Sequence, residues 1–554
     1  MRSVQEVSII SNQKPSTLFV REATGLVREI STRDAFILNL SASPLGPGLV
    51  YMIVGTTLFP GGDVIVPGVV ATILSFFIAA TYAQLSAAFP RSGGDYVFNS
   101  RILHPALGFG MNFSLTLWEW FIAGFYVFFV ASSGISPALV IVGCLTHNQG
   151  LIALGDATGG PVLGFVIGTI VNVAFGLLIL SGTKNVFRVL TPIFVLSLSG
   201  LVVSIGLLAL SGPQVFMAKF NAFAAQWSSA ANAYESAIRD AASRGFTVPR
   251  SDLSLLPPMI AVASSELIWY FWSTYLGGEI RQGNSTRKQM YSMIGSAALN
   301  GVLFVLAMWM VVRVMGYSFL ASTTFLGSSG STTFPFISQV TPGNQLAIFI
   351  SLLSDNSTIA SLLPILFAGW SLVILPALFL QPNRCIFSWA MDRIAPAKFA
   401  EVSEKFHTPI YPTLLGMVTC EISLTILTLF PEYAYTIFAA GVIAPAFASM
   451  LPTAFSALFL PKRRKDLYQL SGLDKTRLLG LPAISVTGLV AAVYLIFLTI
   501  VFFTNPPFGL ASPLMIFASF GPMVVGVIIY YVAKAYRLRQ GIELNQLFAK
   551  IPPE

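Results

Sequence analysis

The sequence is poor in charge, cysteine and histidine, and each shortage excludes a class of protein. Only 10% of its 554 residues are charged, against about 25% in soluble domains, so we expect no large soluble domain. The three cysteines, Cys144, Cys385 and Cys420, imply no disulfide framework. The three histidines are scattered, and no metal-binding histidine pair, phosphate-binding glycine loop or hydrolase serine motif is present. We therefore expect no enzyme, no metal site, no cofactor and no ATP-driven pump.

Apolar residues, in contrast, are abundant and occur in long runs. Hydrophobic residues make up 55% of the chain, and the mean hydropathy is +0.77. A membrane-spanning helix needs about 20 mostly apolar residues, and twelve runs reach that length. We therefore expect an all-α polytopic membrane protein. The predicted spans are 35–58, 64–89, 107–133, 160–181, 189–211, 257–279, 290–315, 361–385, 410–430, 433–460, 481–504 and 511–533.

Lysine and arginine are concentrated in the two tails and in the loops on one side of these spans. The run Lys462-Arg463-Arg464-Lys465 is the densest example. Because basic loops stay in the cytoplasm, both termini are predicted to be cytoplasmic, in a multi-pass protein of the cell membrane. The same asymmetry explains the net charge of +8 without nucleic acid as a partner. The N-terminal tail has no apolar core, so it is not a cleaved signal peptide.

Two of the predicted extracellular segments are long. Gly212–Leu256 contains the alanine-rich, polar stretch Asn221–Arg244, which we expect to be helical in part. The segment 317–360 carries the apolar run Leu346–Leu353, which is too short to span a bilayer. We interpret this run as an extracellular helix that caps the entrance.

The first predicted span is interrupted by Ser43-Pro44-Leu45-Gly46-Pro47-Gly48. A helix does not pass easily through two prolines and two glycines. Lipid tolerates the resulting free backbone groups only where protein or a water-filled cavity satisfies them. A second interrupted segment, Pro258–Gly278, lies in the second half of the chain. Paired breaks in two halves predict the binding site of a secondary transporter.

Four local patterns resemble the amino acid–polyamine–organocation (APC) transporter superfamily, and they are spread over most of the chain. Each stands on the side of the membrane that the spans predict. They are the lead Leu26–Ala35 with the following Gly46-Pro47-Gly48, the segment Pro90-Arg91-Ser92-Gly93-Gly94-Asp95-Tyr96, the end of the sixth span Gly278-Glu279-Ile280-Arg281, and the stretch from Asn383-Arg384 to Thr408-Pro409.

The resemblance implies a LeuT-like fold, with two inverted repeats of five spans and two peripheral helices. It also implies transport of amino acids or related amines by alternating access. The expected parts are a cytoplasmic tail 1–34, a first repeat 35–211, an extracellular loop 212–256, a second repeat 257–460, a cytoplasmic loop 461–480, two further spans in 481–535 and a cytoplasmic tail 536–554.

At the first break, we expect the substrate carboxylate to bind. A helix N-terminus attracts anions through free N–H groups and its positive dipole end. Pro47 has no N–H, so the donors would be Gly46, Gly48 and Leu49. The hydroxyl of Ser43 is a further candidate ligand.

At the second break, Trp269–Thr274 occupies the position that the family unwinds. The resemblance implies an aromatic lid over the substrate, which Phe271 or Trp272 would provide. Packing alone would also explain an aromatic run. The other expected wall residues are Tyr270, Ser273, Trp370 and Ser371.

Carboxylates inside spans are costly and usually functional or paired. Glu266, just before the second break, and Glu119, in the third span, are candidates for proton coupling or for holding a substrate amine. Ser371 has no neighbouring hydroxyl, which disfavours the sodium site of related folds. Val189–Leu210 lacks the lysine of some proton-driven relatives, so proton symport and exchange both stay open.

The aromatic wall favours neutral, apolar substrates. The alternatives are a polyamine or nucleobase transporter on the same fold, or a non-transporting sensor. A sensor usually needs an output domain, and the tails here are short. A channel would show rings of charge or a carbonyl filter, and neither pattern is present.

Overall fold

The computed structural model describes residues 25–329, 342–430 and 444–549. Within these ranges the protein is mostly helical. The one named sheet in them is a hairpin of β1 (Arg477–Leu478) and β2 (Leu481–Pro482), which pair antiparallel. Ten helical stretches are long and apolar enough to cross a membrane. The prediction of an all-α polytopic membrane protein is confirmed.

The helices that correspond to the predicted spans follow the chain in the expected order. They are α1 (Thr32–Ser41) with α2 (Leu45–Leu58), α3 (Val66–Ala88), α5 (Pro105–Val130), α8 (Pro161–Leu180), α9 (Thr183–Leu210), α12 (Leu256–Ser264), α13 (Thr286–Met315), α17 (Ser357–Met391), α18 (Ile410–Leu429), α20 (Ala444–Arg463), α22 (Ala483–Thr504) and α23 (Pro513–Arg539).

Two of the twelve predicted spans are not among the ten long apolar helices. The sixth, 257–279, contains α12, which has only nine residues because the chain then leaves the helix. The tenth, 433–460, begins outside the described residues, and its described part is α20. The third predicted span continues beyond residue 133 through a π-helical turn, and the apolar stretch ends at Leu145.

Short elements connect these helices. They are α4 (Asp95–Ile102), η1 (Ala131–Ile135), α6 (Ser136–Leu145), α7 (Gln149–Gly159), α10 (Pro213–Ala224), α11 (Ala233–Ser243), η2 (Leu253–Leu255), η3 (Trp272–Tyr275), α14 (Tyr317–Ser329), α16 (Pro342–Ser351), η4 (Ala397–Ala400), α21 (Lys465–Leu470), η6 (Leu473–Lys475), η7 (Pro506–Phe508) and α24 (Leu544–Phe548). α10 and α11 confirm that the first long loop is partly helical. α16 contains most of the short apolar run predicted to be a helix.

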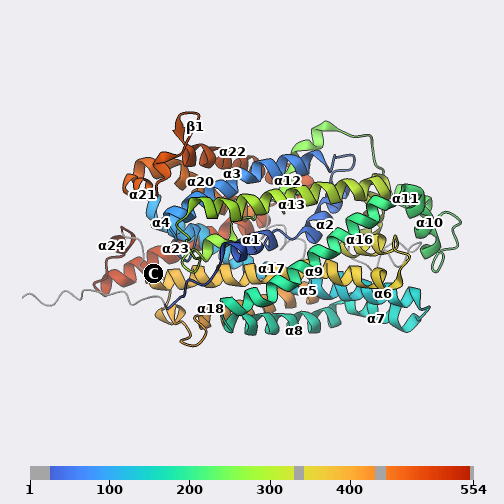
Figure 1. The fold of residues 1–554 in the computed structure, drawn as a ribbon, viewed down its shortest axis with the longest axis horizontal. Helices are drawn as coiled ribbons and strands as arrows, with labels where there is room; N and C mark the ends of the chain where they lie inside the picture. The colour runs from blue at the N-terminus through green and yellow to red at the C-terminus, as the bar shows by residue number, and fades with distance from the viewer. Residues whose placement is uncertain (1–24, 330–341, 431–443, 550–554) are drawn as a thin grey trace, which may run out of the picture.

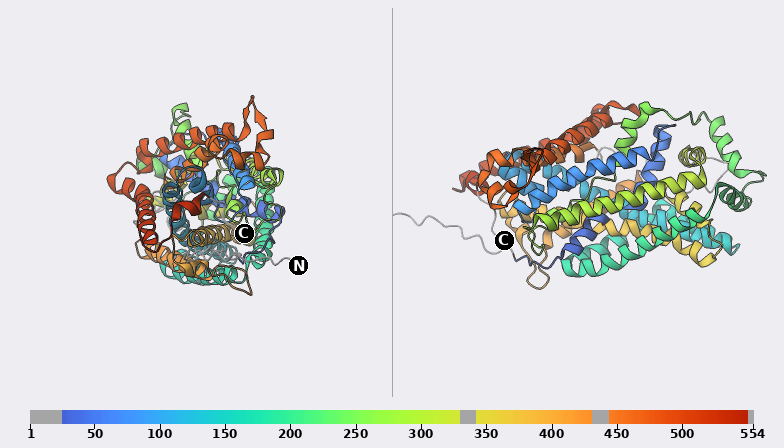
Figure 2. Two further views of the ribbon diagram at one scale, coloured as in Figure 1. Left: turned by 90° about the vertical axis from the view of Figure 1, so that its left-hand side faces the viewer. Right: turned by 45° about the horizontal axis from the view of Figure 1, so that its top comes forward.

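The long helices run side by side along the longest axis of the molecule (Figure 1). α4, α21 and α24 lie at one end, here called the α4 end. α7, α10 and α11 lie at the other, here called the α10 end. Seen along that axis, the helices form a bundle with elements in its interior as well as around its circumference (Figure 2).

Burial separates central from peripheral spans. In the first span, Thr32–Leu58, 83% of the residues in the most apolar stretch are buried. The same share is 28% for both α9 and α23. Large apolar side chains such as Val162 and Phe517 are exposed on peripheral helices, as expected for surfaces that face lipid. The broken span therefore lies in the centre of the bundle, where protein surrounds its free backbone groups.

Candidate functional site

The first break lies slightly earlier than predicted. α1 begins with a capping box between Ser31 and Asp34 and ends at Ser41. The non-helical residues are 42–44, and α2 starts immediately after Pro44. Gly46-Pro47-Gly48 forms the first turn of α2, which tolerates a proline because its N–H would have no intrahelical partner there. Of the interruption predicted at residues 43–48, only Ser43 and Pro44 are non-helical. Ala42, which precedes them, is non-helical as well.

The second break is longer and contains no proline. α12 ends at Ser264, residues 265–271 form turns, and the short helix η3 follows. The predicted unwinding at Trp269–Thr274 is thus found at Trp269–Phe271, but it begins four residues earlier, and Trp272–Thr274 belong to η3. Side chains replace the missing helical bonds: the Ser273 N–H donates to Asn39 Oδ1 on α1 at 2.8 Å.

The two breaks are held together by hydrogen bonds. Asn300 on α13 donates through Nδ2 to the Ser43 carbonyl at 2.8 Å and to the Tyr270 hydroxyl at 3.0 Å. The Ser43 hydroxyl donates to the Glu266 carbonyl. The two interrupted spans therefore meet at the centre of the bundle, as their pairing in the sequence suggested.

A small cavity lies beside this junction. Its volume of about 30 Å³ has space for about one or two water molecules. Residues from both breaks and from α2, α5 and α17 form its wall. They are Ala42, Tyr51, Glu119, Ile122, Tyr126, Ser265, Glu266, Trp269, Trp272, Ile374 and Leu378.

The cavity is lined by aromatic and acidic side chains. Glu119 and Glu266 are 2% and 4% exposed, and no lysine or arginine is among the described residues that line it. Glu266 Oε1 and Trp272 Nε1 have no hydrogen-bond partner within the described part of the chain. An unpaired buried polar atom is costly. The cavity therefore offers an acceptor and a donor to a ligand, and aromatic faces that attract cations.

Of the sequence-predicted residues, the structure brings Glu119, Glu266 and Trp272 to the cavity wall. Phe271, the alternative lid, turns away and stacks on Tyr82 of α3, with ring centroids 3.9 Å apart. The other predicted residues are buried near the junction but do not line the cavity. They are Ser43, Gly46, Gly48, Leu49, Tyr270, Ser273, Trp370 and Ser371.

The glycines of α2 serve close packing. A Cβ on Gly46 would lie 3.0 Å from Trp370 Cδ1, and a Cβ on Gly48 would lie 2.6 Å from Glu266 Cγ. The Gly48 N–H donates to the Pro44 carbonyl at 3.1 Å, so it is not a free donor for a carboxylate. Among the expected donors, Gly46 lies in the first turn, where N–H groups lack an intrahelical acceptor.

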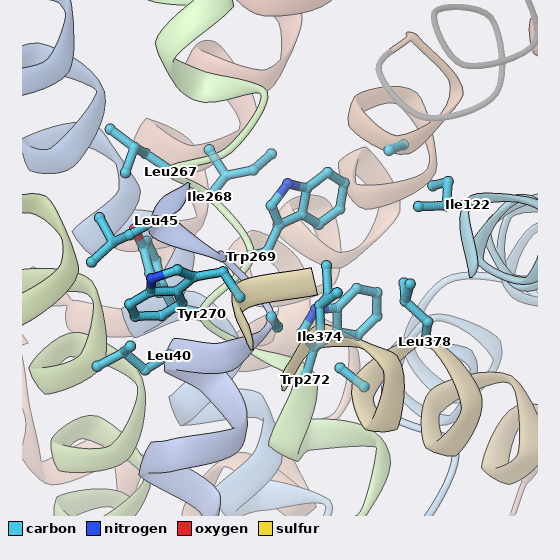
Figure 3. Packing of buried hydrophobic residues seen from close by; sticks show 14 of the residues in the cluster. Leu40, Leu45, Ile122, Leu267, Ile268, Trp269, Tyr270, Trp272, Ile374 and Leu378 are labelled. Carbon is cyan, nitrogen blue, oxygen red and sulfur yellow. The ribbon is translucent and has the colours of Figure 1, made fainter. Parts of the chain in front are cut away.

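Sequence reasoning missed four polar or aromatic wall residues: Tyr51, Tyr126, Ser265 and Trp269. Tyr126 stands seven positions after Glu119, so helical periodicity alone places both on one face of α5. Figure 3 shows Trp269 and Trp272 on the same side of the break as the cavity residues of α5 and α17, with Tyr270 on the opposite side. Trp269 and Trp272 stack with ring planes 6° apart.

Toward the α4 end of α17 lies a buried ion pair, here called the Arg384 clamp. Arg384 of α17 donates to Glu279 through Nε at 2.7 Å and through Nη2 at 2.9 Å. Thr183, at the start of α9, bonds both partners at 2.9 Å. The segment before α1 joins through Ile30, whose N–H donates to the Glu279 carbonyl at 3.0 Å. Four distant parts of the chain therefore meet here.

A second buried ion pair joins α4 to the end of α17. Arg101 donates to both carboxylate oxygens of Asp392, at 2.6 and 2.8 Å, and Tyr96 donates to Asp392 at 2.7 Å. Burial of a charge is tolerated when it is paired and hydrogen-bonded. Each ion pair makes two hydrogen bonds, and each leaves one arginine nitrogen, Arg101 Nε or Arg384 Nη1, without a hydrogen-bond partner among the described residues.

Comparison with known proteins adds two findings. A family model described as amino acid permease matches residues 30–529. Cationic amino acid transporter 1 of Schizosaccharomyces pombe is 28% identical over 124 residues, which is 22% of this chain. That match covers 20% of the relative's own length.

Proposed function

The chain belongs to the amino acid permease family, and from this premise we propose that it is a secondary transporter that carries amines, above all cationic amino acids, by alternating access. The observation that supports this proposal most strongly is the cavity between the two broken spans. It contains two carboxylates and no basic residue among its described wall residues. The family supports transport of amino acids or related compounds. The cavity supports the narrower proposal that the substrates are cationic.

Glu266 is the proposed ligand of the substrate ammonium. Its Oε1 atom is buried without a partner, and it lies beside the aromatic pair Trp269 and Trp272. Glu119 on α5 faces the same cavity and would accept a second positive charge. The name of the yeast relative agrees with such a substrate. This proposal replaces the neutral, apolar substrate that the aromatic run alone suggested.

The loop charges support a cytoplasmic position for the α4 end, because the basic run 462–465 lies there. The Arg384 clamp then closes the cytoplasmic side, and inward opening requires that it separates. A proton on Glu266 in place of the substrate would allow the carrier to return, so that proton and substrate move in opposite directions, as in antiport. Exchange of one amine for another would satisfy the same carboxylate.

The proposal is tested by thermal unfolding of the purified protein with a panel of amino acids, polyamines and nucleobases. A ligand at about 100 times its dissociation constant adds about 2.7 kcal/mol to the stability of the state it binds. We expect shifts with lysine, arginine or diamines, and none for Glu266→Gln. Glu421→Gln is the matched control, since Glu421 bonds Thr169 and Asn172 away from the cavity.

A shift with nucleobases alone would overturn the proposed substrate, and silence across the panel would overturn transport of amino acids. Uptake into proteoliposomes then separates the coupling modes. A pH gradient should drive accumulation in wild type and fail in Glu266→Gln. Accumulation driven by a sodium gradient at constant pH would contradict proton coupling.

A further inference from the structure

Three carboxylates are buried near the α4 end, and they differ in their partners. Glu279 is paired with Arg384, and Asp392 is paired with Arg101. Asp95, the first residue of α4, is 1% exposed and has no salt bridge in the described residues. The contrast is informative because the same region supplies arginines to the other two. Of these three carboxylates, Asp95 is therefore the one without a basic partner among the described residues.

The position of Asp95 is set by a tight junction between α4 and η3. Gly93 and Gly94 precede it with φ of 101° and 52°, and the Gly93 N–H donates to the Tyr275 carbonyl at 3.0 Å. A Cβ on Gly94 would lie 2.6 Å from the Tyr275 ring, so a larger residue could not pack there. Ser92 forms an antiparallel bridge with Leu276. This junction, here called the α4–η3 seam, keeps water from Asp95.

The titratable groups that face Asp95 are all acids. They come from every packed element that presents one: Tyr82 of α3, Glu119 of α5, Tyr275 of η3 and Cys385 of α17. α20, also packed on α4, donates no charge here. Its basic residues are in its last turn, and it meets Asn99 of α4 through two hydroxyl groups.

Hydrogen bonds from side chains, including Tyr275, and from the backbone of α4 favour the ionised form of Asp95, and burial opposes them. Asn112 donates to Asp95 Oδ1 at 2.8 Å, and the N-terminus of α4 attracts negative charge. Burial nevertheless dominates and raises the pKa of Asp95 to about 7. The carboxyl group therefore changes its charge close to neutral pH.

A polar stripe on α5 connects Asp95 with the cavity. Asn112, Thr116 and Glu119 stand at positions i, i+4 and i+7, which is one face of a helix. All three are buried, at 1%, 2% and 2% exposure. One end of the stripe bonds Asp95, and the other end lines the cavity.

We propose that Asp95 is a proton-binding site on the cytoplasmic side of the cavity, which holds its proton while the α4–η3 seam is closed and releases it when the seam opens. This inference rests on the proposed alternating access. The proton comes from water to a carboxylate oxygen and returns to cytoplasmic water, and no other bond changes. The site is separate from Glu266, which would exchange its proton with the substrate.

Infrared spectroscopy of the purified full-length protein tests the site without any substrate. The carbonyl stretching band of a protonated carboxyl group should disappear from wild type with a midpoint near pH 7, as the carboxyl ionises. That component should be missing from Asp95→Asn. In Asn112→Leu, which loses the donor to the carboxylate, the midpoint should move to higher pH. An unchanged band in Asp95→Asn, or an unchanged midpoint in Asn112→Leu, would overturn the assignment.

The link to closure is tested with a disulfide across the seam. Residues directly opposite in an antiparallel bridge have Cα atoms about 4.5–5.5 Å apart, within the range of a disulfide. The double variant Ser92→Cys/Leu276→Cys should hold the seam shut when oxidised and release it when reduced. The oxidised form should keep the Asp95 proton to higher pH than the reduced form. Equal midpoints would overturn the link to closure.

The two proposals fail separately. A ligand-induced thermal shift without an Asp95 titration keeps the transporter and removes the proton site. An Asp95 titration without a thermal shift from any panel compound keeps a buried proton site and removes the proposed substrate.

Discussion

Gly48 sets how closely the backbone of α2 approaches Glu266. An added methyl group would lie 2.6 Å from Glu266 Cγ, so Gly48→Ala must displace that side chain. We expect overpacking to cost about 1–3 kcal/mol of stability and to remove the thermal shift with cationic amino acids. The measurement is thermal unfolding with and without lysine.

Gly206→Ala is the matched control for this change. Gly206 lies inside α9, and an added Cβ meets no atom within 4 Å. Alanine should therefore leave the ligand shift intact and add up to about 1 kcal/mol of helix stability. If the two alanine variants behave alike, Gly48 does not position Glu266.

Asp95 should make stability depend on pH. Its folded pKa of about 7 lies above the usual value of an aspartate, so the folded state binds the proton more tightly than the unfolded state. The contribution is fully present below about pH 4 and is lost as the pH rises to 7. The thermal midpoint of wild type should fall from pH 5 to pH 8 by more than that of Asp95→Asn. Parallel curves for the two proteins would contradict this expectation.

Individual residues could be predicted where helical periodicity or chemistry singled them out. Glu119 and Glu266 were identified because carboxylates are rare inside spans, and both line the cavity. The orientation of Phe271 could not be read in advance. It lies in a segment without regular structure, where sequence spacing does not determine which way a side chain points. Tertiary contact with Tyr82 decides it.

Among the elements, the Arg384 clamp joins α17, α9 and the segment before α1. Glu279→Gln leaves Arg384 buried without a counter-charge, which should cost about 3–5 kcal/mol. The double variant Glu279→Leu/Arg384→Met removes both charges and should be less destabilised than Glu279→Gln. Thermal unfolding of the purified variants measures the difference.

The exposed pair Lys219–Asp355 provides the control for the clamp. Asp355 is 95% exposed, so Asp355→Asn should cost at most about 1 kcal/mol. A double variant that is less stable than Glu279→Gln would contradict a purely electrostatic explanation. The clamp would then contribute through packing.

Helix positions were predictable because long apolar runs must be helical in lipid. The exact position of each break was harder to predict. Pro44 lies in the gap between α1 and α2, whereas Pro47 sits in the first turn of α2, which tolerates a proline. The length of the second break also escaped prediction, since no proline or glycine marks Ser265. It is stabilised by side chains of α1 and α13, which are distant in sequence.

For the whole molecule, the orientation in the membrane can be tested with single cysteines. Glu235→Cys lies on α11 at the α10 end, and Lys475→Cys lies in η6 near the α4 end; both positions are exposed. The native cysteines are buried. On intact cells, a membrane-impermeant maleimide should label Glu235→Cys only. Lys475→Cys should react after permeabilisation, and the reverse pattern would place the α4 end outside.

More of the overall architecture than of the site could be predicted from the sequence. Composition and run length were sufficient for the fold class, since the bilayer allows few alternatives. The inverted-repeat pairing stays a prediction. The Arg384 clamp joins residues as far apart as Ile30 and Arg384, and no local sequence pattern predicts such contacts.

The cavity of about 30 Å³ has a thermodynamic consequence. It is too small for an amino acid, so under the proposed function a wider conformation must accept the substrate, and its rarity would lower the apparent affinity. The apparent dissociation constant is then the intrinsic one divided by the fraction of molecules in that conformation. Each tenfold rarity of the open form weakens binding by about 1.4 kcal/mol.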